Sequence, residues 1–275
     1  MILCQISDMH IKRPGERAYQ RVDTAAYLRR AVTHLNQLWP RPDAVVMTGD
    51  LVDSGDPLEY AHLHALLGDL QIPYYLSAGN HDSRAALRAA FPEHSYLRQH
   101  AEFVQYVVDV GPLRLIALDT QDYPNPGGRL CERRLDWLSD QLAMAEGRPV
   151  VITMHHPPFP TGIGHMDEIG MISPDLDRLR EIVQRHSNVE RILCGHLHRP
   201  IHARFAGTIA STCPSPAHQV ALDLRPDAPS AFMMEPPSYQ LHWWQADTGL
   251  VTHAGFCDAY EGPYPFHDAD GKLIP

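Results

Sequence analysis

Long apolar runs and clusters of basic residues are both missing from this 275-residue chain. Its 23 lysines and arginines are outnumbered by 33 aspartates and glutamates, which gives a formal net charge of -10. Because proteins bind nucleic-acid polymers largely by neutralising phosphates, this balance argues against DNA or RNA as a partner. A membrane partner is not expected either, since a spanning helix needs about 20 apolar residues in a row. A small phosphorylated substrate is compatible with the acidity, because metal ions can supply positive charge locally.

The cysteines are few and show no pairing pattern. There are five, an odd number, and none forms a CxxC pair. Cys4 and Cys194 lie inside apolar, strand-like runs, so we expect buried thiols there. The first residues enter a strand pattern without the basic segment that opens a signal peptide. A reducing cytoplasm therefore suits this sequence better than secretion with a disulfide framework.

Short apolar runs alternate with longer segments of helical periodicity. Strands are expected at 2–6, 44–47, 74–76, 103–110, 113–118, 150–154 and 192–194. Helices are expected from Asp23 to just before Pro40, at 57–70, after Asp82, and at 135–144 and 176–183. This alternation predicts an α/β fold with helices on both faces and some antiparallel strands. After about residue 199 the helical periodicity fades, and further strands are expected near 208–211, 219–224 and 239–244.

Five short segments carry side chains that can bind metal ions, and each closely follows an expected strand. They are Asp8-Met9-His10, Gly49-Asp50, Gly79-Asn80-His81-Asp82, His155-His156-Pro157-Pro158 and Gly195-His196-Leu197-His198. In an α/β sheet the loops at the carboxyl ends of the strands meet in one crevice, so distant segments can converge. Carboxylates, carboxamides and imidazoles are hard or borderline ligands, and no thiolate is among them.

This ligand set suits a pair of divalent cations. Asp50 has two carboxylate oxygens and can bridge both ions. Two such ions about 3.5–4 Å apart can clamp a phosphoryl group and lower the pKa of a bound water from ~15.7 to ~7. We therefore expect phosphoester hydrolysis by a metal-bound hydroxide. These ligand types are compatible with iron, manganese and zinc, and also with cobalt.

The order and spacing of the motifs DxH, GD, GNHD, HHPP and GHLH resemble those of the calcineurin-like metallophosphoesterases. The resemblance runs from residue 2 to about 200 and implies a four-layered α/β/β/α sandwich with mixed sheets. Residues 1–200 are interpreted as the catalytic core and residues 201–275 as a small β-rich C-terminal element. By the same resemblance one metal takes Asp8, His10, Asp50 and His198, and the other takes Asp50, Asn80, His155 and His196. His81 is then the group that contacts the phosphate or the leaving oxygen.

Departures from the family pattern narrow the range of expected substrates. Members acting on phosphoproteins carry an arginine soon after the GD motif, where this chain has Ser54. The remaining sequence motifs resemble those of class III cyclic-nucleotide phosphodiesterases and, more closely, those of bacterial glycerophosphodiesterases. The implied substrate is a small phosphodiester, either a glycerophosphodiester or a 3′,5′- or 2′,3′-cyclic nucleotide. In that branch Asn80 and His81 contact the substrate, and Tyr19 and His218 are candidate pocket residues.

Two alternative functions and the roles of two groups of residues stay open at this point. The chain could be a protein-binding scaffold of the same fold without turnover, or a metal-dependent nuclease, which the net charge disfavours. His156 is interpreted as orienting His155 or a bound water rather than as a ligand. The aromatic residues of the tail, Tyr239, Trp243, Trp244, Tyr260 and Tyr264, form either core or a contact between copies. We favour the contact, and hence a homo-oligomer, a dimer or larger.

Overall fold

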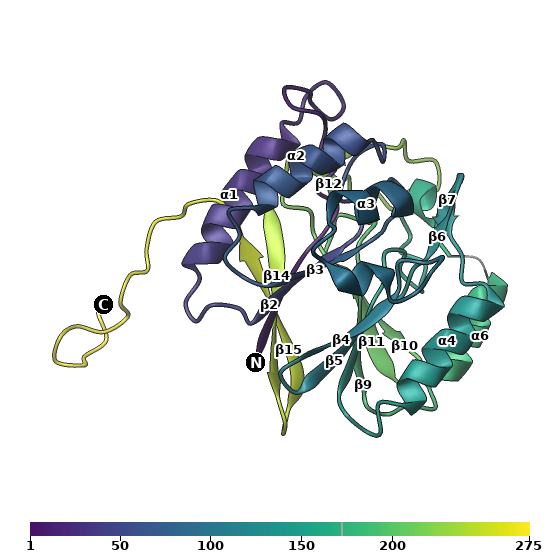
Figure 1. The fold of residues 1–275 in the computed structure, drawn as a ribbon. Helices are drawn as coiled ribbons and strands as arrows, with labels where there is room; N and C mark the ends of the chain where they lie inside the picture. The colour runs from purple at the N-terminus through teal and green to yellow at the C-terminus, as the bar shows by residue number, and fades with distance from the viewer. Residues whose placement is uncertain (172) are drawn as a thin grey trace.

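Two large mixed β-sheets organise the computed structural model, which describes residues 1–171 and 173–275 (Figure 1). The first sheet has the order β15-β14-β1-β2-β3, which are Gly249–Phe256, Ser238–Gln245, Ile2–Ile6, Ala44–Thr48 and Tyr74–Ser77. The second has the order β10-β11-β9-β8-β5-β4, which are His202–Phe205, Thr208–Thr212, Val189–Cys194, Val150–Thr153, Leu113–Ala117 and Tyr106–Val110. Strands β1, β2 and β3 are parallel, as are β5, β8, β9 and β11.

Helices cover the outer face of each sheet. Helices α1 (Thr24–Gln37), α2 (Pro57–Leu67) and α3 (Arg84–Ala90) lie on the first sheet, and α4 (Glu132–Ala143) and α6 (Ser173–Val183) lie on the second. The shorter elements are the 3-10 helix η1 (Ser95–Arg98), helix α5 (Gly164–Asp167), and the pairs β6 (Gln121–Asp122) with β7 (Asn125–Gly128) and β12 (Gln219–Val220) with β13 (Phe232–Met233). No helix among the described residues is both long and apolar enough to cross a membrane.

The core has one apolar layer between the sheets and one under each helical layer. Leu3 and Val46 of the first sheet pack with Leu115, Val151 and Leu193 of the second. The other two layers join each sheet to its own helices. The predicted four-layered α/β/β/α sandwich is therefore confirmed.

Helix α1 illustrates how the sequence specifies these layers. The side chain of Asp23 accepts a hydrogen bond from the Ala26 backbone N–H at 2.9 Å, so it caps the helix as predicted. Leu28, Val32 and Leu35 recur at helical spacing, and all three are buried.

Several boundaries differ from the predictions. Helix α2 ends at Leu67, not at residue 70, and Gly68 is its C-cap, whose backbone N–H donates to the His64 backbone oxygen. The strand expected at 219–224 stops at Val220, and Leu222 and Leu224 beyond it are exposed. The strand expected at 103–110 begins only at Tyr106.

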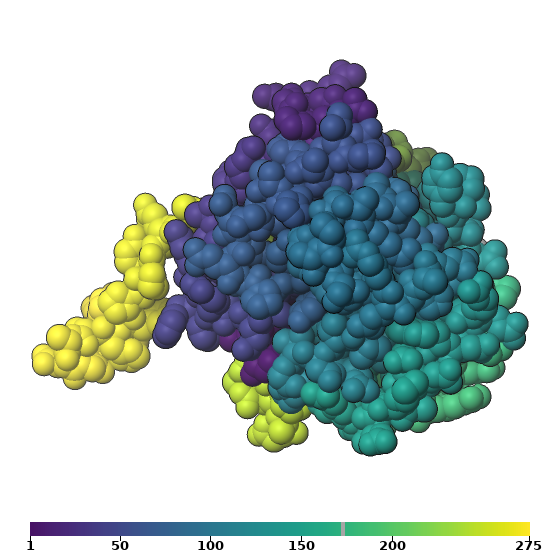
Figure 2. Space-filling view, in the orientation of Figure 1, coloured from purple at the N-terminus to yellow at the C-terminus, as the bar shows by residue number. Residues whose placement is uncertain are grey.

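The C-terminal segment supplies strands to both large sheets. Strand β14 lies antiparallel to β1, and β11 lies parallel to β9. Tyr239 is buried, and its hydroxyl lies 3.1 Å from Nε2 of His34, so this aromatic residue belongs to the core. Residues 259–275 are exposed and project from the body of the molecule (Figure 2). All five cysteines are free thiols, and Cys4 and Cys194 are buried as expected.

Candidate metal centre

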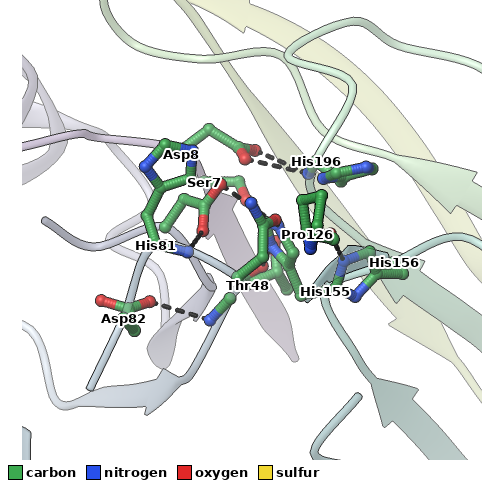
Figure 3. Close-up of polar contacts among 12 residues, drawn as sticks. Ser7, Asp8, Thr48, His81, Asp82, Pro126, His155, His156 and His196 are labelled. Atoms are coloured by element: carbon green, nitrogen blue, oxygen red, sulfur yellow. Dashed lines mark hydrogen bonds and ion pairs between the residues drawn. The ribbon is translucent and has the colours of Figure 1, made fainter. Parts of the chain in front are cut away.

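All seven predicted ligands lie in loops at the carboxyl ends of five strands. Asp8 and His10 follow β1, Asp50 follows β2 and Asn80 follows β3. His155 follows β8, and His196 and His198 follow β9, so these three come from the second sheet. Figure 3 shows Asp8, His155 and His196 gathered in one place although they come from three loops. The sandwich thus brings ligands from both sheets together at one edge.

The backbone at most of these positions is strained. Asp8, His10, Asp50, His196 and His198 all have positive φ, between 45° and 71°. Such a conformation costs roughly 1–3 kcal/mol for a non-glycine residue and persists where surrounding contacts enforce it. Two backbone hydrogen bonds help to enforce it, from Asp8 N to Gly49 O and from His10 N to Asp50 O, both 3.0 Å. Strain concentrated in one crevice is typical of a functional site.

Asp8, His10 and His198 form a first cluster, in which one ligand atom from each lies within 4.8 Å of the others. Nδ1 of His198 donates to the backbone oxygen of His218 at 3.0 Å, which leaves its Nε2 with a lone pair. That Nε2 faces Nε2 of His10 at 3.2 Å. Two such nitrogens repel unless a proton or a metal cation lies between them. Burial holds the pKa of His198 well below its usual value, which favours the neutral form that binds metals.

His155, His196, Asn80 and Asp50 surround a second position. Nδ1 of His155 donates to the Thr48 backbone oxygen at 2.8 Å, and its Nε2 lies 3.0 Å from Oδ1 of Asn80. Nε2 of His196 is buried and has no hydrogen-bond partner among the described residues. An orphaned imidazole nitrogen of this kind is costly unless something absent from the protein chain binds it.

A single oxygen of Asp50 faces both clusters. Oδ2 of Asp50 lies 3.7 Å from Nε2 of His10 and 3.3 Å from Nε2 of His155. Burial alone would raise the pKa of Asp50, but the neighbouring His155 and His81 rings hold it well below the usual range. Burial likewise lowers the pKa of His155, yet the Asp50 carboxylate outweighs burial and raises it to about 9. The donor set therefore fits two cations bridged by one carboxylate.

His156 also lies near the second position, but both of its ring nitrogens are occupied. Nδ1 lies 2.8 Å from the Thr120 hydroxyl, and Nε2 donates to the Pro126 backbone oxygen at 3.0 Å. Burial, followed by the neighbouring His155, lowers the pKa of His156 to about 3, so the ring is neutral. These contacts favour a role in supporting His155 and His196 over a role as a ligand.

His81 lies at the border between the metal ligands and a cavity. Its backbone N–H donates to Oδ1 of Asp50 at 2.9 Å, and its Nδ1 donates to the Asp53 backbone oxygen at 2.7 Å. The cavity has a volume of about 570 Å³. Its lining includes Asn80, His81, Ser54, Arg84 and Tyr123. Nε2 is the ring nitrogen that the Asp53 backbone oxygen leaves unengaged.

The two candidate pocket residues lie against the first cluster. The His218 ring centroid is 4.8 Å from that of His198 and 5.6 Å from that of His10. Tyr19, whose backbone also has positive φ, meets the His218 ring edge-on at 5.3 Å and stacks on Phe232 at 5.0 Å. His218 is buried and Tyr19 is half exposed.

The Asp82 carboxylate links two of the loops that carry predicted ligands. No role was predicted for this residue from the sequence. Its carboxylate accepts hydrogen bonds from Gly79 N at 2.8 Å, Leu51 N at 3.2 Å and the Tyr60 hydroxyl at 2.8 Å. These bonds join the loop of Asp50 to the loop of Asn80. The only sequence signal was its place beside the Asn-His pair.

Glycine is required where these loops touch. A Cβ atom on Gly79 would overlap Oδ1 and the backbone nitrogen of Asp50 and would lie 2.8 Å from Cε1 of His155. Only a residue without a side chain therefore lets the backbone at position 79 approach Asp50 and His155 this closely.

The profile of the calcineurin-like phosphoesterase family matches residues 1–200. The chain belongs to this family. Membership in the calcineurin-like phosphoesterases makes the chain a hydrolase, and the family's dinuclear metal site agrees with the donor set described above.

Relatives match nearly the whole length of the chain, including the residues that follow the part matched by the family profile. It is 39% identical over 274 residues to a probable glycerophosphodiester phosphodiesterase of Arcobacter nitrofigilis, with all of both chains covered. It is 35% identical over 268 residues to a probable cyclic nucleotide phosphodiesterase of Rhodopseudomonas palustris, covering 96% of this chain and 95% of the relative. Among solved structures, a dimetal phosphatase of Danio rerio has the same fold, with a TM-score of 0.62, 16% identity, and coverage of 94% of this chain and 99% of that one.

Proposed function

We propose that this chain hydrolyses small phosphodiesters with a dinuclear metal centre held by Asp8, His10, Asp50, Asn80, His155, His196 and His198. The observation that carries the proposal is the position of Asp50, whose Oδ2 faces both ligand clusters. Bound there, two divalent cations would lower the pKa of a water and neutralise charge on the phosphoryl oxygens. The two full-length relatives named above support a diester as substrate.

The protein's own groups would position the diester and assist the leaving group. Nδ1 of His81 is held by the Asp53 backbone oxygen, so Nε2 is the nitrogen that meets the substrate. In its protonated form this nitrogen gives a proton to the leaving alkoxide or a hydrogen bond to a phosphoryl oxygen. Ser54 lines the cavity where phosphoprotein phosphatases carry an arginine. A diester monoanion needs less positive charge than a monoester dianion, which agrees with this difference.

Asp50→Ala tests the proposal directly. We expect it to lose both metal occupancy and turnover, because the bridging carboxylate is removed from both positions. Metal content by elemental analysis and hydrolysis of a model diester are measured on the same preparation. An Asp50→Ala protein that contains no metal yet turns over like the wild type would refute the proposal.

A substrate panel then separates the diester classes. The metal-free protein is reloaded with manganese, iron, zinc or cobalt and assayed on glycerophosphodiesters and on 3′,5′- and 2′,3′-cyclic nucleotides. A scaffold without turnover would give no hydrolysis with any metal. A nuclease would instead prefer oligonucleotides, with an activity that falls steeply as salt rises.

We also propose a homo-oligomer in the cytoplasm. The projecting segment 259–275 exposes Tyr260, Tyr264 and Phe266, which supports a contact between copies. Five free thiols fit a reducing compartment. Light scattering of the full chain, compared with a chain truncated after residue 258, measures the first of these proposals.

A further inference from the structure

A carboxylate outside the predicted ligand set faces one of the ligand histidines. Oδ1 of Asp53 lies 3.4 Å from Nδ1 of His10, the ring nitrogen on the side away from His198. Nδ1 of His10 is buried and has no hydrogen-bond partner among the described residues, and the Asp53 carboxylate is the acceptor that faces it. Asp53 is therefore the group available to fix the orientation and the tautomer of this ring.

Charged neighbours hold Asp53 in place. Its Oδ2 accepts a hydrogen bond from Nζ of Lys12 at 2.8 Å, and the same ammonium lies 3.6 Å from Oε1 of the buried Glu59. Oε2 of Glu59 in turn accepts from the Ser54 backbone N–H at 2.8 Å. This row of alternating charges prevents the Asp53 carboxylate from turning away from His10.

His10, Asp53 and His81 offer three atoms within 4.8 Å of one another, a geometry that also occurs in metal sites. Two contacts argue against a separate metal ion between these three residues. The Lys12 ammonium already neutralises the Asp53 carboxylate, and Nδ1 of His81 is engaged by the Asp53 backbone oxygen. The arrangement is better explained as support for His10.

We propose that Asp53 is a positioning residue for the metal centre. Its carboxylate accepts the Nδ1 proton of His10 and thereby directs the Nε2 lone pair toward Asp8 and His198. The inference rests on the proposed function, because Asp53 acts only through a cation that His10 binds. Partners of this kind typically change metal affinity or activity by about 10–100-fold.

The test measures metal affinity as well as activity. Wild-type protein and variants are stripped of metal and titrated with Mn²⁺ against a chromophoric chelator. Asp53→Ala is expected to weaken one of the two binding steps by about 10–100-fold and to leave the other unchanged. Asp53→Asn keeps an oxygen acceptor for His10 and nearly the same volume, so it should lose less affinity. Hydrolysis by both variants should recover as Mn²⁺ is raised, which a merely structural defect would not allow.

Asp56→Asn is the matched control. Asp56 lies in the same loop and pairs with Arg13, and its carboxylate makes no contact with the ligand histidines. Unchanged Mn²⁺ affinity in Asp53→Ala, or an equal loss in Asp56→Asn, would overturn the role of Asp53. If wild-type protein binds two Mn²⁺ and hydrolyses diesters while Asp53→Ala matches it, only this inference fails. If the wild type binds no metal, the proposed function fails together with it.

Discussion

A buried histidine far along the chain from the ligand loops should make this protein sensitive to acid. His242 of β14 lies in the first sheet, where its Nδ1 is 2.9 Å from the Thr252 hydroxyl and its Nε2 is 3.2 Å from Oε1 of Gln5. Burial, followed by the nearby charge of Arg191, lowers the pKa of His242 to about 3. The ring is therefore neutral in the folded protein over the whole working range of pH.

The sign of the effect follows from the two pKa values. Above pH ~6.5, the ordinary histidine pKa, the ring is neutral in both the folded and the unfolded state. As pH falls below that value the unfolded chain gains a proton that the folded chain cannot accept, so the free energy of unfolding falls. At pH 5 the difference is roughly 1.5 pKa units at 1.36 kcal/mol each, or ~2 kcal/mol from this residue.

Urea denaturation of metal-free protein at pH 7.5 and pH 5 measures this contribution. Between pH 7.5 and pH 5, the free energy of unfolding of His242→Gln is expected to fall by about 2 kcal/mol less than that of the wild type. This difference does not depend on the stability of the variant at pH 7.5. His253→Gln, at an exposed position on β15, is the matched control and should lose as much as the wild type. A His242→Gln protein with the wild-type loss would show that the ring is not buried in a neutral form.

The remaining predictions concern the metal centre itself. Gly79→Ala should lose metal affinity and activity because the new Cβ overlaps Asp50. Gly164→Ala should keep both, since the nearest atom to its new Cβ would be 3.7 Å away. Metal content measured alongside activity checks this prediction. His81→Ala should retain its metals and turn over ~10²-fold or more slowly, while His64→Ala, exposed on α2, should match the wild type; equal kinetics in the two variants would exclude the imidazole from the reaction. Metal removal with a chelator should lower the melting temperature, since an ion at 100 times its Kd stabilises by ~2.7 kcal/mol, and an unchanged value would argue against a tightly bound ion.

The layers of the fold were predictable because periodicity and chain order are local signals. The cap at Asp23 and the helical spacing of Leu28 and Val32 predicted α1, and short, mostly apolar runs predicted the central strands β2 and β8 of the two sheets. Strand β15 was missed. It pairs only with β14, at the edge of the sheet, and its Gly-Leu-Val-Thr-His-Ala-Gly-Phe run lacks a continuous apolar pattern. Pairing with a partner, which no local pattern records, determines its conformation.

The candidate ligands were predictable for a different reason, namely that several metal-binding side chains stand at strand ends in a recognisable order. Asp53 and Lys12 gave no comparable signal. Each is a single charged residue in a loop, and such residues are usually solvated. Their importance depends on a contact between segments 41 residues apart in the sequence, which appears only after β1 and β2 are paired.

The site also explains why a sandwich of two sheets suits this chemistry. Asp8, His10, Asp50 and Asn80 come from the first sheet, whereas His155, His196 and His198 come from the second. Neither sheet alone supplies either predicted cluster. The first cluster needs His198 from the second sheet, and the second cluster needs Asp50 and Asn80 from the first sheet. Apolar packing between the sheets, through residues such as Leu3 and Val151, therefore fixes the distance between the two half-sites. The strained backbone at five of the predicted ligand positions is tolerated because that packing and the loop hydrogen bonds hold these residues in place.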